Sequence, residues 1–218
     1  MGAKSLSCNP TLNTLKFLDL SNNEIRNDGV KFIADCSIWT ELRILMLNEV
    51  LIDNIAIKFL AANESWVKRQ ELHLQGNPHI EDQGVIWLSY NRSWKLSKLT
   101  VNNSNFGDVR LEMLRRNKVY KDFVGKTCDS QAMRKELSIG SNQTWIDLQE
   151  FCLNENRVEN PGAITIGSNI TWDRLKKLYL DSNNIGDEGA VAIGTNTTWI
   201  DLEQLLLQQN QRIKERLQ

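Results

Sequence analysis

Tryptophan recurs along this chain at an almost constant interval. The series consists of Trp39, Trp66, Trp94, Trp145, Trp172 and Trp199. Successive members are 27 or 28 residues apart, except between Trp94 and Trp145, where Tyr120 stands near the middle. Leu12 extends the series by one step, and Trp87 alone is out of phase. A fixed period of this length is typical of an array of stacked repeat units, so the repeat constrains the fold more than any other feature.

Each period contains a strand pattern followed by a helix pattern. One copy reads Leu175-x-x-Leu178-x-Leu180-x-x-Asn183. The L-x-L pair has the two-residue period of a short strand with one buried face. In residues 185–193, apolar residues recur at three and four positions and acidic residues occupy the first turn, as in an amphipathic helix. The sequence therefore predicts a strand, a turn and a helix in every unit.

The string L-x-x-L-x-L-x-x-N resembles the leucine-rich repeat, and units of 27–28 residues with a helical second half are similar to its ribonuclease-inhibitor-like subclass. Residues 183–190 resemble repeats in the recognition region of NOD-like receptors. The resemblance implies an α/β fold, a leucine-rich repeat solenoid or horseshoe, with a parallel β-sheet on the concave face and α-helices on the convex face. The packing distances predict the same curvature. Neighbouring helices need about 8–10 Å between axes, whereas neighbouring strands need only about 4.8 Å. The helix side of the stack is therefore longer, and the strands lie on the inside of the curve.

The pattern predicts a single array over residues 1–218, with about seven to eight units. Residues 120–145 keep the pattern only faintly, and we interpret them as one degenerate unit; a flexible joint or a ligand-facing irregularity is the alternative. Residues 6–12 align with residues 193–199, so the chain is expected to begin on the tail of a helix. It is expected to end before the eighth unit is complete. Because solenoids need capping units, further repeats or a cover are expected at either end.

Two asparagine positions are predicted to be structural. The asparagine that ends the strand motif is expected to satisfy backbone groups of its own and the next unit. The five triplets that directly precede a periodic tryptophan match the N-glycosylation acceptor N-x-S/T; they begin at Asn63, Asn91, Asn142, Asn169 and Asn196. We interpret them as repeat architecture, with asparagine in the left-handed conformation that ends a helix, Ser or Thr bonding locally, and the following Trp in the core. The alternative places the tryptophans on the surface as binding anchors.

Composition and motifs argue against several classes of function. The net charge of −1 combines 26 basic with 27 acidic residues, so bulk charge attracts neither nucleic acid nor an anionic membrane. There is no membrane-length apolar run and no secretory signal. The four cysteines are scattered, which favours reduced thiols in a cytoplasmic protein over a zinc site. No phosphate-binding loop, H-E-x-x-H or G-x-S-x-G string is present, so we expect no enzyme activity, no metal and no cofactor.

The strand pattern identifies two columns of side chains on the concave face. Strand alternation sends the residue between the two leucines, and the residue after the second leucine, to the side opposite the core. The first column is Asp19, Met46, His73, Thr100, Thr127, Cys152, Tyr179 and Leu206. The second column is Ser21, Asn48, Gln75, Asn102, Asp129, Asn154, Asp181 and Gln208. Apolar and aromatic members of the first column are suited to anchoring a partner.

These features predict a non-catalytic protein-protein interaction module that binds another protein or a peptide through its concave β-face. One alternative is a GTPase-regulating protein, because Ran GTPase activators resemble the same repeat subclass. A second alternative is a structural fragment of a larger receptor or effector array. An inner face that is merely solvated is the simplest competing interpretation.

Overall fold

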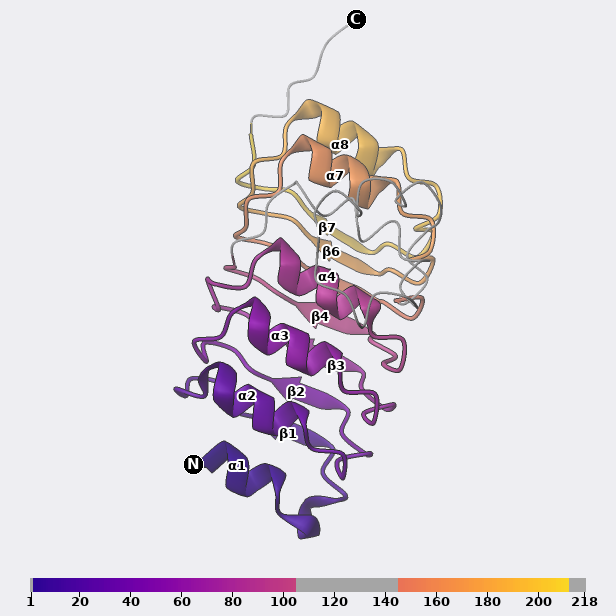
Figure 1. Ribbon diagram of the computed structural model, residues 1–218. Helices are drawn as coiled ribbons and strands as arrows, with labels where there is room; N and C mark the ends of the chain where they lie inside the picture. The colour runs from indigo at the N-terminus through magenta and orange to yellow at the C-terminus, as the bar shows by residue number, and fades with distance from the viewer. Residues whose placement is uncertain (1, 105–144, 212–218) are drawn as a thin grey trace, which may run out of the picture.

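The computed structural model describes residues 2–104 and 145–211 (Figure 1). In these ranges the chain is a stack of units with strands on one side and helices on the other. The strands are β1 (Phe17–Asp19), β2 (Ile44–Met46), β3 (Glu71–His73), β4 (Lys98–Thr100), β5 (Glu150–Cys152), β6 (Lys177–Tyr179) and β7 (Gln204–Leu206). The helices are α1 (Gly2–Ser7), η1 (Pro10–Leu12), α2 (Arg26–Ala34), α3 (Asn54–Ala61), α4 (Asp82–Tyr90), α7 (Asn160–Gly167) and α8 (Asp187–Gly194).

The described strands form one open parallel sheet in chain order from β1 to β7. The register places equivalent residues of successive units side by side, as Leu45 pairs with Leu72 and Leu72 with Leu99. These three leucines are 0% exposed. The L-x-L pattern is therefore explained by strand alternation. The first leucine is the central residue of the strand and faces the helices, and its two neighbours face the other side of the sheet.

Strands β4 and β5 are hydrogen-bonded neighbours although residues 105–144 lie between them in the sequence. Thr100 pairs directly with Cys152, and the Val101 N–H donates to the Cys152 carbonyl at 3.1 Å. Thr127 and Asp129, which the predicted columns place between these strands, lie outside the described residues. The predicted degenerate unit of residues 120–145 lies outside the described residues, apart from Trp145.

The helices pack against one another in sequence, α1 on α2, α2 on α3, α3 on α4, and α7 on α8 (Figure 1). Local sequence explains why they form. In α3, the Asp53 side chain accepts a hydrogen bond from the Ile55 N–H at 2.7 Å, which caps the first turn. Ala56, Ile57 and Leu60 then recur at helical spacing and are buried against the sheet.

The periodic tryptophans lie in the interior of the stack. All six are between 0% and 7% exposed. The rings of Trp66 and Trp94 stack at 6.2 Å between centroids and 22° between planes. The Trp66 Nε1–H donates to the Cys36 carbonyl of the preceding unit at 3.0 Å. The prediction of core tryptophans is confirmed, and the alternative of surface anchors is wrong for this series.

The asparagine that ends the strand motif joins adjacent units. The Asn77 Nδ2 donates to the Leu47 and Leu74 carbonyls, both at 2.8 Å, and its Oδ1 accepts from the Val50 N–H at 3.1 Å. Asn183 and Asn210 repeat this arrangement. The structural role is confirmed, but the joined unit is the preceding one and not the next.

The N-x-S/T asparagines form a second ladder at the other end of each helix. The Asn63 Oδ1 accepts from the N–H groups of Ser65 and Trp66, while its Nδ2 donates to the Ala34 carbonyl of the preceding unit at 2.6 Å. The Ser65 hydroxyl bonds to the same Oδ1, so the predicted local bond is confirmed. Asn63 is only 8% exposed. The nitrogen that a glycan would occupy is therefore already engaged with the backbone.

The left-handed conformation predicted for these asparagines is wrong. The described ones, Asn63, Asn91, Asn169 and Asn196, do not have a positive φ. Positive φ values occur instead in the turn after each strand, at Asn22, Glu49, Gly76, Asn103, Glu155, Ser182 and Gln209. The side chain of asparagine, which bonds to backbone on both sides, ends the helix without requiring that conformation. Asn142 lies outside the described residues.

The out-of-phase Trp87 belongs to a second repeat, on the outer surface of the helices. Lys58 Nζ lies 5.0 Å from the centroid of the Trp87 ring. Two equivalent pairs precede it in the stack, Lys4 on Phe32 and Lys31 on Phe59, at 5.6 and 5.7 Å. Each lysine covers an aromatic ring of the next helix, and exposed cation–π contacts of this kind contribute about 0.5–1 kcal/mol each. These contacts join each helix from α1 to α3 to the helix of the next unit.

Arg69 replaces the first leucine of the motif in the third unit and is completely buried. Its side chain is 0% exposed, and none of its three guanidinium nitrogens has a hydrogen-bond partner. The guanidinium lies 4.7 Å from the centroid of the Trp66 ring and 5.6 Å from that of Trp94. Burial lowers the pKa of Arg69 to about 9, so the group still carries its charge at neutral pH. Within residues 2–104 and 145–211, the two indole faces are the only groups that compensate this buried charge.

We expect Arg69→Leu to raise the free energy of unfolding by about 1–4 kcal/mol, because it removes a desolvated charge and restores the leucine found in the other units. Urea denaturation followed by circular dichroism measures the change. Leu42→Arg is the matched reverse substitution at the equivalent buried position and should lower stability by a comparable amount. A loss of stability in Arg69→Leu would show that stacking on the indoles outweighs desolvation.

Candidate functional site

The strand face is the surface made by the first and third residues of β1–β7, on the side of the sheet opposite the helices. The first predicted column supplies the third residue of each strand. In this column Asp19 and Leu206 are exposed, whereas Met46, His73 and Tyr179 are half-buried. Thr100 and Cys152 are 7% and 4% exposed, so the prediction that these two side chains are open to a partner is wrong.

The second predicted column is engaged in holding the units together. The Ser21 Oγ accepts from the Asn48 N–H at 3.2 Å, and the Asn48 Oδ1 accepts from the Gln75 N–H at 2.9 Å. Each side chain thus bonds to the backbone of the following unit. Asn102, Asn154 and Asp181 are half-buried in the same column, and Gln75 and Gln208 are exposed. Ser21 and Asn48 thus link successive units at the β1–β3 end of the column, whereas Gln75 and Gln208 face solvent.

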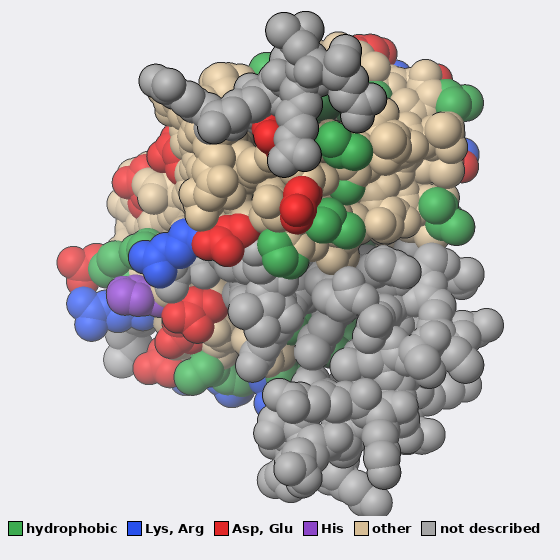
Figure 2. Space-filling model, turned by 90° about the horizontal axis from the view of Figure 1, so that it is seen from above, with side chains coloured by type: hydrophobic (Ala, Val, Ile, Leu, Met, Phe, Trp, Pro, Cys, Tyr) green, Lys and Arg blue, Asp and Glu red, His purple; other side chains and the backbone are tan. Residues whose placement is uncertain are grey.

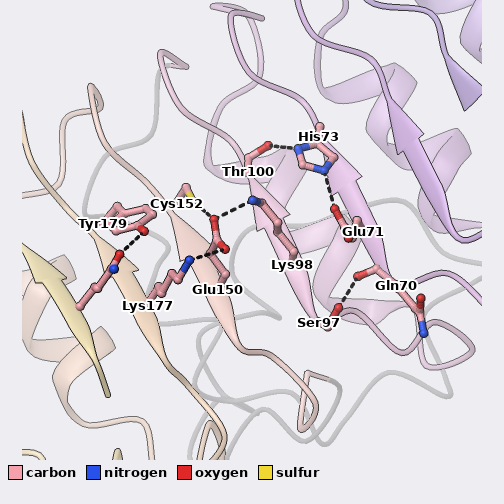
Figure 3. Close-up of polar contacts among 11 residues, drawn as sticks. Gln70, Glu71, His73, Ser97, Lys98, Thr100, Glu150, Cys152, Lys177 and Tyr179 are labelled. Carbon is pink, nitrogen blue, oxygen red and sulfur yellow. Dashed lines mark hydrogen bonds and ion pairs between the residues drawn. The ribbon is translucent and has the colours of Figure 1, made fainter. Parts of the chain in front are cut away.

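A charged row crosses the middle of the strand face from β4 to β6 (Figure 3). The Lys98 Nζ lies 2.7 Å from one oxygen of Glu150, and the Lys177 Nζ lies 3.7 Å from the other. Partial burial opposes the charged form of Glu150, but the hydrogen bond from Lys98 and the two positive charges outweigh it and lower its pKa. Glu150 therefore stays ionised and fixes both lysine side chains.

A second group of polar contacts joins β3 to β4 (Figure 3). The His73 ring bonds through Nε2 to Glu71 at 3.0 Å and through Nδ1 to the Thr100 hydroxyl at 3.1 Å. The His73 side chain is only 12% exposed. The sequence correctly placed His73 and Thr100 on this face. It did not show that the two side chains are in contact, because the register of the sheet brings them together.

Cys152 lies beside Glu150, with 3.6 Å between its Sγ and a carboxylate oxygen (Figure 3). Burial, reinforced by the negative charge of Glu150, raises the pKa of the Cys152 thiol to about 12. The thiolate is the reactive form of cysteine, and almost none is present at neutral pH. Cys152 therefore contributes packing and a weak donor to the strand face and not a nucleophile.

The two ends of the strand face are less polar than its middle. At the β1–β2 end, Phe17 is 51% exposed and pairs in register with the half-buried Ile44. At the β6–β7 end, the Tyr179 hydroxyl donates to Gln204 at 2.6 Å, and Leu206 is 37% exposed (Figure 3). The sequence columns omitted Phe17 and Ile44. The alternation rule extended two residues towards the start of each strand would have found them.

Charges elsewhere on the surface are mixed. Figure 2 shows acidic and basic side chains next to one another on its left side. In the described ranges, no three His, Cys, Asp or Glu side chains are grouped so that they could hold a metal ion. No helix in those ranges combines the length and the apolar character that crossing a bilayer requires.

Residues 11–34 and 175–194 match the family model described as Leucine Rich repeat. No curated protein matches the sequence. Among solved structures, the chain is similar to an internalin from Listeria monocytogenes, with a TM-score of 0.56 and 16% identity over 94% of this chain and 51% of that one. The chain thus spans about half the length of that internalin. The fold is that of an α/β leucine-rich repeat solenoid, as predicted.

Proposed function

We propose that this chain is a non-catalytic protein-binding module whose strand face contacts another protein or a peptide. The observation that carries the proposal is the fixed row of half-exposed side chains across β3–β6, in which Lys98, Glu150 and Lys177 hold one another in place. Side chains that are ordered before binding lose little conformational entropy when a partner docks. Leucine-rich repeat scaffolds generally serve as interaction surfaces, which supports the same function.

Two finer assignments accompany the proposal. The helix in every complete described unit supports the ribonuclease-inhibitor-like subclass, and the repeats resemble those of NOD-like receptors. A cytoplasmic location is supported by the free thiols of Cys8, Cys36 and Cys152 and by the engaged amides of the N-x-S/T triplets. Fractionation of cells that produce the tagged chain tests the location, and a glycosylated or disulfide-bonded product would contradict it.

Affinity capture from a lysate tests the strand face directly. The variant His73→Ala/Tyr179→Ala/Asp181→Ala should lose a partner that the unaltered chain retains, because it truncates two side chains of the strand face and one of the adjoining second column. Lys31→Ala and Glu188→Ala alter exposed side chains of α2 and α8 and should retain it. A partner kept by the triple variant but lost from the helix variants would reject the proposal. Thermal melts of all variants check that the fold is intact.

A further inference from the structure

The β1–β2 end of the strand face combines exposed apolar side chains with a surplus of positive charge. The apolar part is Phe17, Ile44 and Met46, which are exposed or half-buried on adjacent strands. Lys16 and Arg43 directly precede these strands, and both are exposed. The Arg43 N–H and the Ile44 N–H both donate to the Lys16 carbonyl, which fixes the two basic residues as neighbours. We name these five residues the basic-apolar patch.

Positive charge around the patch exceeds what the protein itself neutralises. Lys68 of the next unit is hydrogen-bonded to Glu41. That bond, followed by the charges of Lys68, Arg43 and Lys16, lowers the pKa of the Glu41 carboxyl. Three cations therefore surround a single carboxylate. Lys68 forms an ion pair with this carboxylate, whereas Lys16 and Arg43 have no ion pair in the part of the chain that the structure describes.

Two carboxylates adjoin the patch on the strand face, and each is hydrogen-bonded to a residue outside the patch. Asp19, which pairs in register with Met46, accepts a hydrogen bond from the Ser21 N–H at 2.9 Å. Glu71 lies on the far side of Ile44 in the sheet and is bonded to His73. Neither is paired with Lys16 or Arg43 in the described residues. The patch thus offers an apolar anchor point with two uncompensated cations at one edge.

We propose that the basic-apolar patch binds an acidic polypeptide segment that carries an apolar anchor residue. The anchor packs on Phe17, Ile44 and Met46, and carboxylates beside it pair with Lys16 and Arg43. This inference rests on the proposed function and specifies the partner chemistry for one end of the strand face. The centre of that face, where charges already neutralise one another, adds shape and hydrogen bonds but little net attraction.

Selection from a random peptide library displayed on phage, against the immobilised full chain, tests the proposal. We expect enriched peptides to combine Phe, Leu or Trp with neighbouring Asp or Glu. A synthetic peptide of the consensus should bind about tenfold more weakly to Lys16→Glu/Arg43→Glu and to Phe17→Ser, because each change removes on the order of 1.4 kcal/mol. Added salt should weaken binding as well, since the ion pairs lie at the surface.

Lys176→Glu is the matched control, because Lys176 is exposed at the equivalent position before β6. It should leave the peptide affinity unchanged, and all variants should melt like the unaltered chain. Several results would overturn the inference: no enriched peptide, peptides without acidic residues, affinity insensitive to Lys16→Glu/Arg43→Glu, or equally tight binding of single-stranded RNA. A dimer in analytical ultracentrifugation that Phe17→Ser abolishes would also overturn it, because a second copy would then cover the patch.

The same variants separate this inference from the proposed function. A captured protein that is lost with the strand-face triple variant but retained by Lys16→Glu/Arg43→Glu and Phe17→Ser would overturn the patch alone. A captured protein retained by every strand-face variant would overturn the proposed function. If the captured protein is lost with the triple variant and also with the patch variants, the result supports both the proposed function and the inference about the patch.

Discussion

Trp172→Ala is expected to lower the free energy of unfolding by about 3–5 kcal/mol. The ring is 1% exposed and lies between two other aromatic rings, stacked on Trp145 at 6.4 Å and edge-on to Phe151 at 5.4 Å. Its removal opens a cavity that spans two units, and neither neighbour can fill the space without losing its own contacts. Urea denaturation monitored by far-ultraviolet circular dichroism measures the loss independently of tryptophan fluorescence.

Trp87→Ala provides the matched control for this change. Trp87 is the same residue type but half-buried on the outer surface of α4, where it contacts Lys58 and Tyr90. Its truncation exposes little core and forfeits mainly a cation–π contact, so it should cost much less. Equal losses for the two variants would contradict the assignment of separate core and surface tryptophan positions.

Asn77→Ala should cost about 3 kcal/mol or more, because several buried backbone groups lose their partner at once. Asn77 is 0% exposed and bonds to the Leu47 and Leu74 carbonyls and to the Val50 N–H. Leaving a buried donor or acceptor unsatisfied costs about 1–3 kcal/mol for each group. Chemical denaturation again provides the measurement, and hydrogen exchange should show faster exchange of the Val50 amide.

Asn23→Ala is the control at the equivalent position of the first unit. Asn23 is exposed and bonds only to the Leu20 and Ser21 carbonyls of its own unit. In the described residues it makes no bond to another unit, so the expected cost is below that of Asn77→Ala. If Asn77→Ala proved as mild as Asn23→Ala, the ladder between units would contribute little to stability.

The asparagine positions show how far the repeat pattern reaches. Recurrence identified both ladders as structural, because a residue that returns in most units must serve a need that those units share. Recurrence could not show the direction of the bonds. The amide of Asn63 points back to Ala34 because the helix end of the preceding unit exposes a carbonyl there. That geometry exists only after two units have stacked.

On the strand face, too, the sequence pattern predicted some features of the side chains and not others. Alternation placed His73, Tyr179 and Met46 on the correct side of the sheet from the sequence. It did not show that Thr100 and Cys152 are buried there, because burial depends on neighbouring side chains that the register brings together. The direct pairing of β4 with β5, across an interval of residues 105–144, was likewise outside the reach of a pattern that assumes every period contributes a strand.

The sequence by itself determined that the chain is a stack of strand–turn–helix units, because the period of the tryptophans and leucines sets which residues must share one core. Only the tertiary structure decided which side chains are left over for binding. The exposed Phe17, the neutralised row around Glu150 and the uncompensated Lys16 and Arg43 all result from contacts between units. Charge pairing and exposure depend on distances across the stack, and a one-dimensional pattern does not contain them.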